Sequence, residues 1–224
     1  MKVLLILMML WTTSLLAQSG LLLPDLITSP FHLLDNKIDT NTIPGQRLLR
    51  FANATPNFGR GKLELRGGEM HSDGTQDVDQ IIYKRDGTFI SRLAGTFIHH
   101  PEHNHTHFND YANYRLRKVN FIRGLGRVVA ESSKISFCIR DSSIAYPLLP
   151  GFRLRAGYKT CETTVQGISV GWMDVYSKDL PGQWIDISHL ARGRYWLESV
   201  VDPFNRIKES NENNNIARVM IYIN

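Results

Sequence analysis

The chain has 224 residues, of which 42% are hydrophobic and 21% are charged, and its formal net charge is +5 at pH 7. The basic residues are scattered without long runs, which argues against nucleic-acid binding and favours a solvated surface. The length is sufficient for one sizeable hydrophobic core, and neither an internal repeat nor a low-complexity linker divides the chain. We therefore expect one folded domain.

The N-terminus is typical of a secretory signal. Lys2 precedes an apolar run over residues 3–11, and small and polar residues follow up to Gly20. This run is too short to span roughly 30 Å of hydrocarbon comfortably. We predict a signal peptide over residues 1–17, cleaved near 17–20, and no membrane span later in the chain. The protein is thus expected to be secreted, or periplasmic if its source is bacterial.

Short β-rich runs bounded by Gly, Asn, Asp and Pro recur along the rest of the chain, whereas helical periodicity is almost absent. In the last run, apolar side chains alternate with Arg218 and Tyr222, the pattern of a half-buried strand. The predicted strands cover residues 62–65, 80–84, 111–121, 128–139, 183–187, 194–201 and 216–223. They predict an all-β fold, a single β-sandwich-like domain over residues 24–224 with long irregular loops between about 142 and 182.

Five of the eight histidines fall within the nine residues 99–107. Neutral imidazole is the commonest protein ligand of transition ions such as copper, zinc, iron and nickel. In an extended segment alternate side chains share a face, so His103, His105 and His107 would point the same way. The spacing predicts three imidazoles that bind one metal ion. The alternatives are a solvated histidine-rich loop or an expression tag, but tags are terminal and contiguous.

Two cysteines, Cys138 and Cys161, suit an oxidising compartment. The sequence leaves open whether they pair with each other or are both free. Asn53-Ala54-Thr55 and Asn104-His105-Thr106 match the acceptor pattern for N-glycosylation, a short signal that recurs by chance.

Four blocks of sequence together resemble the catalytic domain of the lysyl oxidase family, and they occur in the family's order. The blocks are His103-x-His105-x-His107-Phe108, VAESSKISFC over residues 129–138, Asp174-Val175-Tyr176 and QWIDI over residues 183–187. The similarity runs from about Pro24 to the C-terminus. The spacers resemble those of short microbial members more than those of the animal enzymes.

The resemblance implies a copper-dependent amine oxidase that converts primary amines, peptidyl lysine among them, to aldehydes. Dioxygen would be the acceptor, and ammonia and hydrogen peroxide the other products. The resemblance also implies the site residues, which are the copper ligands His103, His105 and His107 and a lysine tyrosylquinone cofactor derived from Lys134 and Tyr176.

Asp174 lies two residues before Tyr176, so the two side chains would share a face in a strand. Because the reaction needs a base near the cofactor, Asp174 is the candidate base. Without the family resemblance, Lys134 reads as a surface lysine and Tyr176 as a tyrosine at the edge of the core.

The segment ESNENNN over residues 209–215 resembles a family segment that binds calcium together with an N-terminal Asp-Leu pair. Carboxylate, amide and backbone oxygens are the ligands that calcium prefers. The calcium ligands implied by the resemblance are Asp25, Leu26, Glu209, Asn211, Asn214 and Asn215. Asn211 stands where the family has an acidic residue, which lowers the ligand charge. The alternative is a polar hairpin tip.

The chain also departs from the family pattern. Cys138 and Cys161 match positions that pair in the family with cysteines missing here, and the stretch after Asp141 differs, so substrate specificity does not transfer. Two other classes stay open. A cupin-like non-haem metal enzyme would require Asp110 and the later His189, and a non-catalytic β-sandwich adhesion module would keep only a vestigial metal site.

Overall fold

The computed structural model describes residues 20–100, 105–120, 122 and 124–224, so the predicted signal peptide lies outside the described residues. The fold is all-β, as the alternation of β-branched and aromatic residues with polar ones predicted. A short helix, α2 (Pro30–Leu33), begins at a proline, whose fixed φ suits the first helical turn. In the described part of the chain, no helix is long and apolar enough to cross a membrane.

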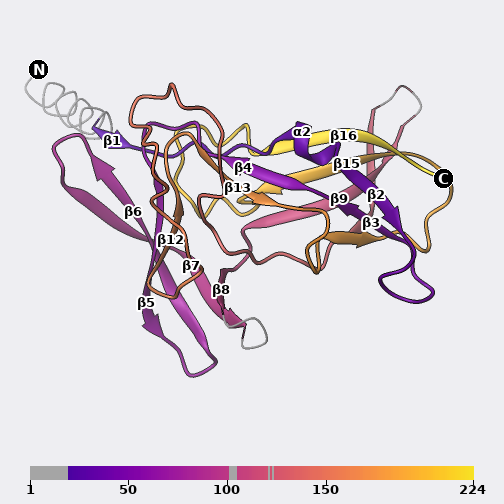
Figure 1. The fold of residues 1–224 in the computed structure, drawn as a ribbon, viewed down its shortest axis with the longest axis horizontal. Coiled ribbons are helices and arrows are strands. Elements are labelled where there is room, and N and C mark those ends of the chain that lie inside the picture. The colour runs from indigo at the N-terminus through magenta and orange to yellow at the C-terminus, as the bar shows by residue number, and fades with distance from the viewer. Residues whose placement is uncertain (1–19, 101–104, 121, 123) are drawn as a thin grey trace, which may run out of the picture.

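A six-stranded antiparallel sheet forms one end of the molecule (Figure 1). Its order is β12-β5-β6-β7-β8, and β1 pairs with the outer part of β6. The strands are β1 (Leu21–Leu22), β5 (Leu63–Met70), β6 (Thr75–Lys84), β7 (Phe89–His100), β8 (His105–Phe108) and β12 (Val165–Ile168). The histidine-bearing strand β8 is therefore at the end of the sheet, and among the described residues only β7 forms a ladder with it.

A four-stranded antiparallel sheet lies at the other end, in the order β10-β9-β15-β16. Its strands are β9 (Ala112–Val119), β10 (Leu125–Glu131), β15 (Gly193–Val201) and β16 (Ile216–Ile223). Strand β16 has the predicted alternation, because Arg218 and Tyr222 are exposed and Met220 is half-buried, whereas the residues that alternate with them are buried, namely Ala217, Val219, Ile221 and Ile223.

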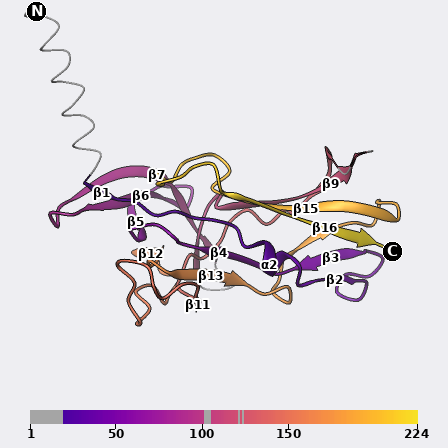
Figure 2. The ribbon, with the colours of Figure 1, turned by 90° about the horizontal axis from the view of Figure 1, so that it is seen from above.

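Two three-stranded sheets complete the fold, in the orders β14-β3-β2 and β11-β13-β4. Their strands are β2 (Asn36–Asp39), β3 (Leu48–Phe51), β4 (Asn53–Pro56), β11 (Ser143–Ile144), β13 (Trp172–Tyr176) and β14 (Trp184–Asp186). Seen from above, β3, β4 and β13 form a layer that faces the layer of β15 and β16 (Figure 2). This two-layer arrangement is the sandwich-like part of the molecule.

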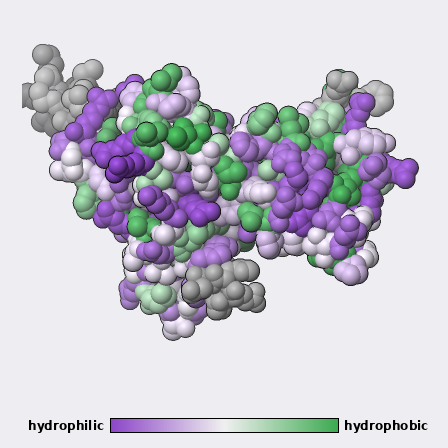
Figure 3. Space-filling view, in the orientation of Figure 1, coloured by the Kyte–Doolittle hydropathy of each residue, from purple (hydrophilic) through white to green (hydrophobic). Residues whose placement is uncertain are grey.

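One hydrophobic core connects all four sheets. Its buried members include Leu65 of β5, Leu197 of β15, Trp172 of β13 and Ile185 of β14. On the face drawn in Figure 3, hydrophobic residues appear only as small separate groups among the described residues. The buried apolar side chains of the core thus join the sheets to one another.

The structure differs from the predicted strands after Glu131, where β10 ends. The Ser132 hydroxyl accepts a hydrogen bond from Lys134 N at 3.2 Å, and such local side-chain bonds compete with strand pairing. Beyond Glu131 the segment keeps single backbone hydrogen bonds, such as Ser132 N to the Tyr114 carbonyl, and an isolated bridge between Phe137 and Phe108 of β8. The region expected to be irregular, 142–182, contains three strands: β11, which pairs with β13, and β12 and β13, whose ladders with β5 and β4 join residues far apart in the sequence.

Candidate active site

His105 and His107 point to the same side of β8, as their spacing predicted, and line one pocket. Their Nε2 atoms are 2.8 Å apart. Two nitrogens that bind one ion at right angles, with bonds of about 2.0 Å, are separated by about 2.8 Å. The two imidazoles therefore fit two neighbouring positions around a transition metal ion. The third predicted ligand, His103, lies outside the described residues.

Lys134 and Tyr176 come together at the same pocket. The Lys134 Nζ lies 5.6 Å from the centre of the Tyr176 ring and 5.1 Å from that of Phe137. The rings of Phe137 and Tyr176 meet edge to face with centroids 4.9 Å apart. Burial lowers the pKa of Lys134, which increases the fraction of its neutral, nucleophilic amine.

The Tyr176 hydroxyl donates a hydrogen bond of 2.8 Å to the carbonyl of Cys138. Burial, followed by the nearby carboxylate of Asp174, raises the pKa of Tyr176 well above its ordinary value. Since Tyr176 is the last residue of β13, its backbone is fixed by the ladder with β4 while its ring reaches into the pocket. The phenol is therefore neutral and held in one orientation.

Asp174 shares the Tyr176 face of β13 and lines the same pocket, although its side chain is only 3% exposed. Its Oδ1 accepts a hydrogen bond from the Ser142 hydroxyl at 3.1 Å, whereas the described residues supply no hydrogen-bond partner for Oδ2. Burial raises the pKa of Asp174 to about 8. A carboxylate with this pKa that lines a pocket and has one buried oxygen without a partner is suited to accept a proton near neutral pH.

The pocket has a volume of about 350 Å³, which is within the range of small-molecule sites. Apolar walls come from Val175, Leu180 and Pro181, and Arg140 adds a positive charge. Sequence reasoning did not identify these residues, or Phe137, as parts of the site. Phe137 and Arg140 lie within or beside a recognised block, but the loop that carries Leu180 and Pro181 gave no signal.

Cys138 and Cys161 form a disulfide, with their Cα atoms 5.3 Å apart. Of the two alternatives that the sequence left open, the structure thus selects pairing with each other. The disulfide lines the pocket, and the Cys161 carbonyl accepts a hydrogen bond from Thr106 N at 2.9 Å. Through this bond the disulfide links strand β8 to Cys138, the residue whose carbonyl binds the Tyr176 hydroxyl.

The residues that a cupin-like enzyme would need are not brought together in the described part of the fold. Asp110 Oδ2 pairs with Arg206 at 2.9 Å, and the exposed His189 contacts the carbonyl of Val129 at 3.1 Å. Neither residue lines the histidine pocket.

A second polar site lies where the N-terminal segment meets the loop before β16. Glu209 accepts hydrogen bonds from Leu26 N and from Asn215 Nδ2, the latter at 2.7 Å. Asn214 Nδ2 donates to Asp25 Oδ1 at 2.7 Å. Five of the six predicted calcium ligands are thus in contact with one another. Asn211 is exposed, and its Oδ1 accepts a hydrogen bond from Asn213 N at 3.1 Å.

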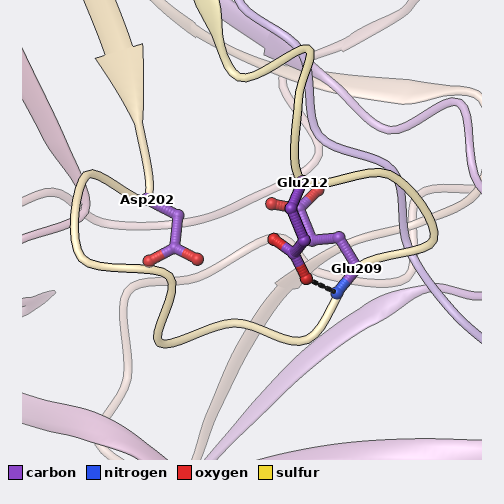
Figure 4. Close-up of side chains that lie close together, drawn as sticks. All are labelled: Asp202, Glu209 and Glu212. Carbon is purple, nitrogen blue, oxygen red and sulfur yellow. Dashed lines mark hydrogen bonds between the residues drawn. The ribbon is translucent and has the colours of Figure 1, made fainter.

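Two further carboxylates that sequence reasoning missed belong to this second site. Figure 4 shows Asp202 and Glu212 beside Glu209, and their candidate ligand oxygens all lie within 4.8 Å of one another. Oxygens bound to one calcium ion at 2.3–2.6 Å are at most about 5 Å apart. Burial raises the pKa of Glu209 to about 8 and also raises the pKa of Asp202.

Comparison with known proteins decides among the open classes, because the family model described as lysyl oxidase matches residues 87–224. The chain belongs to the lysyl oxidase family. The match covers the histidine strand, Lys134 and Tyr176, together with the segment 209–215, and agrees with the resemblance that the sequence blocks indicated.

Named relatives of this lysyl oxidase family member are animal proteins. Lysyl oxidase homolog 2 of Xenopus tropicalis is 33% identical over 165 residues, which cover 73% of this chain and 19% of the relative. Protein-lysine 6-oxidase of Homo sapiens is 36% identical over 120 residues, 53% of this chain and 26% of the relative. The corresponding protein of Sus scrofa is 35% identical over 123 residues, 54% of this chain and 45% of the relative. The chain thus spans less than half the length of each of these relatives.

Proposed function

We propose that the protein is a secreted copper-dependent amine oxidase. It would convert a primary amine, dioxygen and water to an aldehyde, ammonia and hydrogen peroxide. The observation that carries the proposal is the convergence of Lys134, Tyr176 and the two imidazoles of β8 on one pocket. Membership of a family whose relatives are named protein-lysine 6-oxidases supports it.

We propose His105 and His107, together with His103, as the copper ligands. The separation of 2.8 Å between the described Nε2 atoms supports this assignment, and imidazole is a favoured ligand of copper. When bound there, copper would supply the activation of dioxygen that oxidation of the Tyr176 ring requires.

Lys134 and Tyr176 would form the lysine tyrosylquinone cofactor. The Lys134 amine loses its proton more readily than an exposed lysine because of burial, and its Nζ already lies over the ring to which it would bond. The buried Phe137 ring packs against both Lys134 and Tyr176. Its edge-to-face contact orients the Tyr176 ring. The disulfide is compatible with the oxidising surroundings of a secreted protein.

Asp174 would be the base that removes a proton from the α-carbon of the substrate. Its Oδ1 accepts a hydrogen bond from Ser142, and its buried Oδ2 has no hydrogen-bond partner among the described residues, so the carboxylate has capacity to hold a transferred proton. The walls formed by Val175, Leu180 and Pro181 suit the methylene chain of an alkylamine, including a lysine side chain. These walls exclude water from the carbon at which the proton is removed.

The decisive experiment is peptide mass spectrometry of protein that has been loaded with copper and exposed to air. We expect a crosslinked peptide pair containing Lys134 and Tyr176, with absorbance and carbonyl-reagent labelling of a quinone. A copper-free sample exposed to air in parallel is the control. Absence of the crosslink from copper-saturated protein would contradict the proposed cofactor.

We further propose that the second polar site binds calcium. The buried amide oxygens of Asn214 and Asn215 have no hydrogen-bond partner among the described residues, and a cation would provide one. Glu209 and Asp25 supply carboxylates, and Leu26 a backbone carbonyl, the ligand types that calcium prefers. Asp202 and Glu212 lie close enough to replace the charge that is lost where Asn211 stands in place of an acidic residue.

A further inference from the structure

Gln166 of β12 connects the two walls of the active-site pocket. Its side chain is fully buried, and both ends of its amide bind backbone groups. The Nε2 donates to the carbonyl of Thr106 at 2.8 Å, and the Oε1 accepts from Ile139 N at 2.9 Å. A second, longer bond of 3.2 Å joins Nε2 to the carbonyl of Glu162.

Both backbone partners of Gln166 belong to segments that carry the proposed chemistry. Thr106 lies between the two imidazoles of β8. Ile139 follows Cys138, whose carbonyl accepts the hydrogen bond of the Tyr176 hydroxyl. The Gln166 amide thus connects the backbone of β8, which carries the two imidazoles, to the Cys138–Ile139 backbone, which accepts the hydrogen bond of the Tyr176 hydroxyl.

This connection is important because β8 is short in the described part of the chain, His105–Phe108, and within that part forms a ladder only with β7. Its other edge is held by single contacts, namely Gln166, the Thr106 N bond to Cys161 and the bridge between Phe108 and Phe137. Ile139 is fully buried next to the disulfide-bonded Cys138, and Gly167 N donates to its carbonyl at 3.0 Å. Gln166 therefore holds the edge strand β8 at a set distance from the segment that contains Ile139.

We infer that Gln166 is a positioning residue that sets the separation between the imidazoles of β8 and the Tyr176 ring, and thereby the rate at which the cofactor forms. The inference rests on the proposed amine oxidase function. Displacement of reacting groups by about 1 Å slows reactions by on the order of 100-fold, so loss of the amide should act on rate more than on binding.

The experiment compares Gln166→Met with Gln80→Met. Gln80 is an equally buried glutamine with the same type of paired bonds, donating to the Lys208 carbonyl at 2.9 Å and accepting from Lys208 N at 2.8 Å. Each full-length protein is loaded with copper without oxygen and then mixed with dioxygen. The rate of quinone absorbance, the fraction of Lys134–Tyr176 crosslink by mass, the bound copper and the Tm are measured.

Both variants should lose thermal stability, because each removes a buried side-chain amide that both donates to and accepts from the backbone. Only Gln166→Met should form the crosslink more slowly, by on the order of 10- to 100-fold, while still binding one copper per chain. Should Gln166→Met fail to fold, Gln166→Glu replaces it, since this variant keeps an acceptor for Ile139 N but removes the amide donor to Thr106.

Formation of the crosslink at the parental rate in the Gln166 variant, or equal slowing in the Gln80 control, would overturn the inference and leave the proposed function intact. A parent protein that never forms the crosslink would overturn the proposed function and the inference with it. The two failures are therefore distinguishable.

Discussion

The side-chain nitrogen of Lys134 lies 5.6 Å from the centre of the Tyr176 ring, although the two residues are on separate segments of the chain. Both side chains contact Phe137, which holds them on one wall of the pocket. A bond between them therefore requires rotation of the lysine side chain and no rearrangement of the sheets.

Lys134→Arg should abolish the quinone. Arginine keeps the positive charge, but its guanidinium stays protonated and cannot supply a neutral attacking amine. The variant should bind copper, lack quinone absorbance and produce no amine-dependent peroxide. It should also lack the stabilisation from the covalent link, on the order of 4 kcal/mol, in denaturant unfolding. Lys178→Arg is the control, since Lys178 pairs with Asp35 outside the pocket. Amine oxidation by Lys134→Arg at the parental rate would refute the quinone mechanism.

His105→Ala should remove the bound copper, because two remaining imidazoles leave a transition ion with too few protein ligands. Elemental analysis after dialysis is the measurement, with an expected fall from one copper per chain to well below that value. His189→Ala should keep its copper, since the His189 ring contacts Val129 and does not line the pocket. Full copper occupancy in His105→Ala would show that the ion binds elsewhere.

Asp174→Asn should reduce kcat by on the order of 10²- to 10⁴-fold, because the amide cannot accept a proton. In the parent, the base acts in its ionised form, so kcat/KM should rise as the pH increases through about 8, the pKa to which burial raises this carboxyl. The measurement is the pH profile of peroxide release from a primary amine. A profile that is unchanged in the variant would exclude Asp174 as the base.

The same substitution should alter the pH dependence of stability in a defined direction. The folded state keeps the Asp174 proton up to a pH of about 8, whereas the unfolded state releases it near the ordinary carboxyl pKa. Stability of the parent therefore falls as the pH rises between these values. Asp174→Asn should show a smaller decrease across this window in denaturant unfolding. A steeper decrease in the variant would contradict the raised pKa.

Added calcium should raise the Tm, because a ligand that binds only the folded state stabilises it in proportion to RT ln(1 + [L]/Kd). Glu209→Gln should abolish the increase. Glu212→Gln should weaken it more than Asn211→Ala, since the Glu212 carboxylate lies within 4.8 Å of those of Asp202 and Glu209 while the Asn211 side chain is exposed. The exposed Glu69→Gln is the control. An unchanged Tm in millimolar calcium would leave this segment as a polar turn.

Replacing both cysteines with alanine should destabilise the fold by about 3 kcal/mol, the chain-entropy value for a loop of this size. The disulfide closes a sequence separation of 23 residues. It joins Cys138, whose carbonyl accepts the Tyr176 hydrogen bond, to Cys161, whose carbonyl accepts the hydrogen bond of Thr106 N. Denaturant unfolding of copper-free protein measures the effect without the quinone crosslink. A loss below about 1 kcal/mol would show that the surrounding sheets alone fix these segments.

The sequence predicted the features that depend on local pattern. Strand β16 followed from its alternation, and the shared face of His105 and His107 followed from their spacing by two. It did not predict β12 and β13 as strands, because their partners lie far away in the chain and their own residues alternate weakly. Asp202 was missed for a similar reason, since only the folded loop brings it beside Glu209.

The buried position of Asn53 has a practical consequence for producing the protein. Its side chain is 3% exposed, accepts a hydrogen bond from Ser199 at 3.0 Å, and its backbone pairs directly with Tyr176 across β4 and β13. A sugar chain attached at this acceptor sequence has no room in the folded protein and would separate the two strands next to Tyr176. Hosts that attach glycans during secretion would thus yield an inactive fraction that carries a glycan at Asn53.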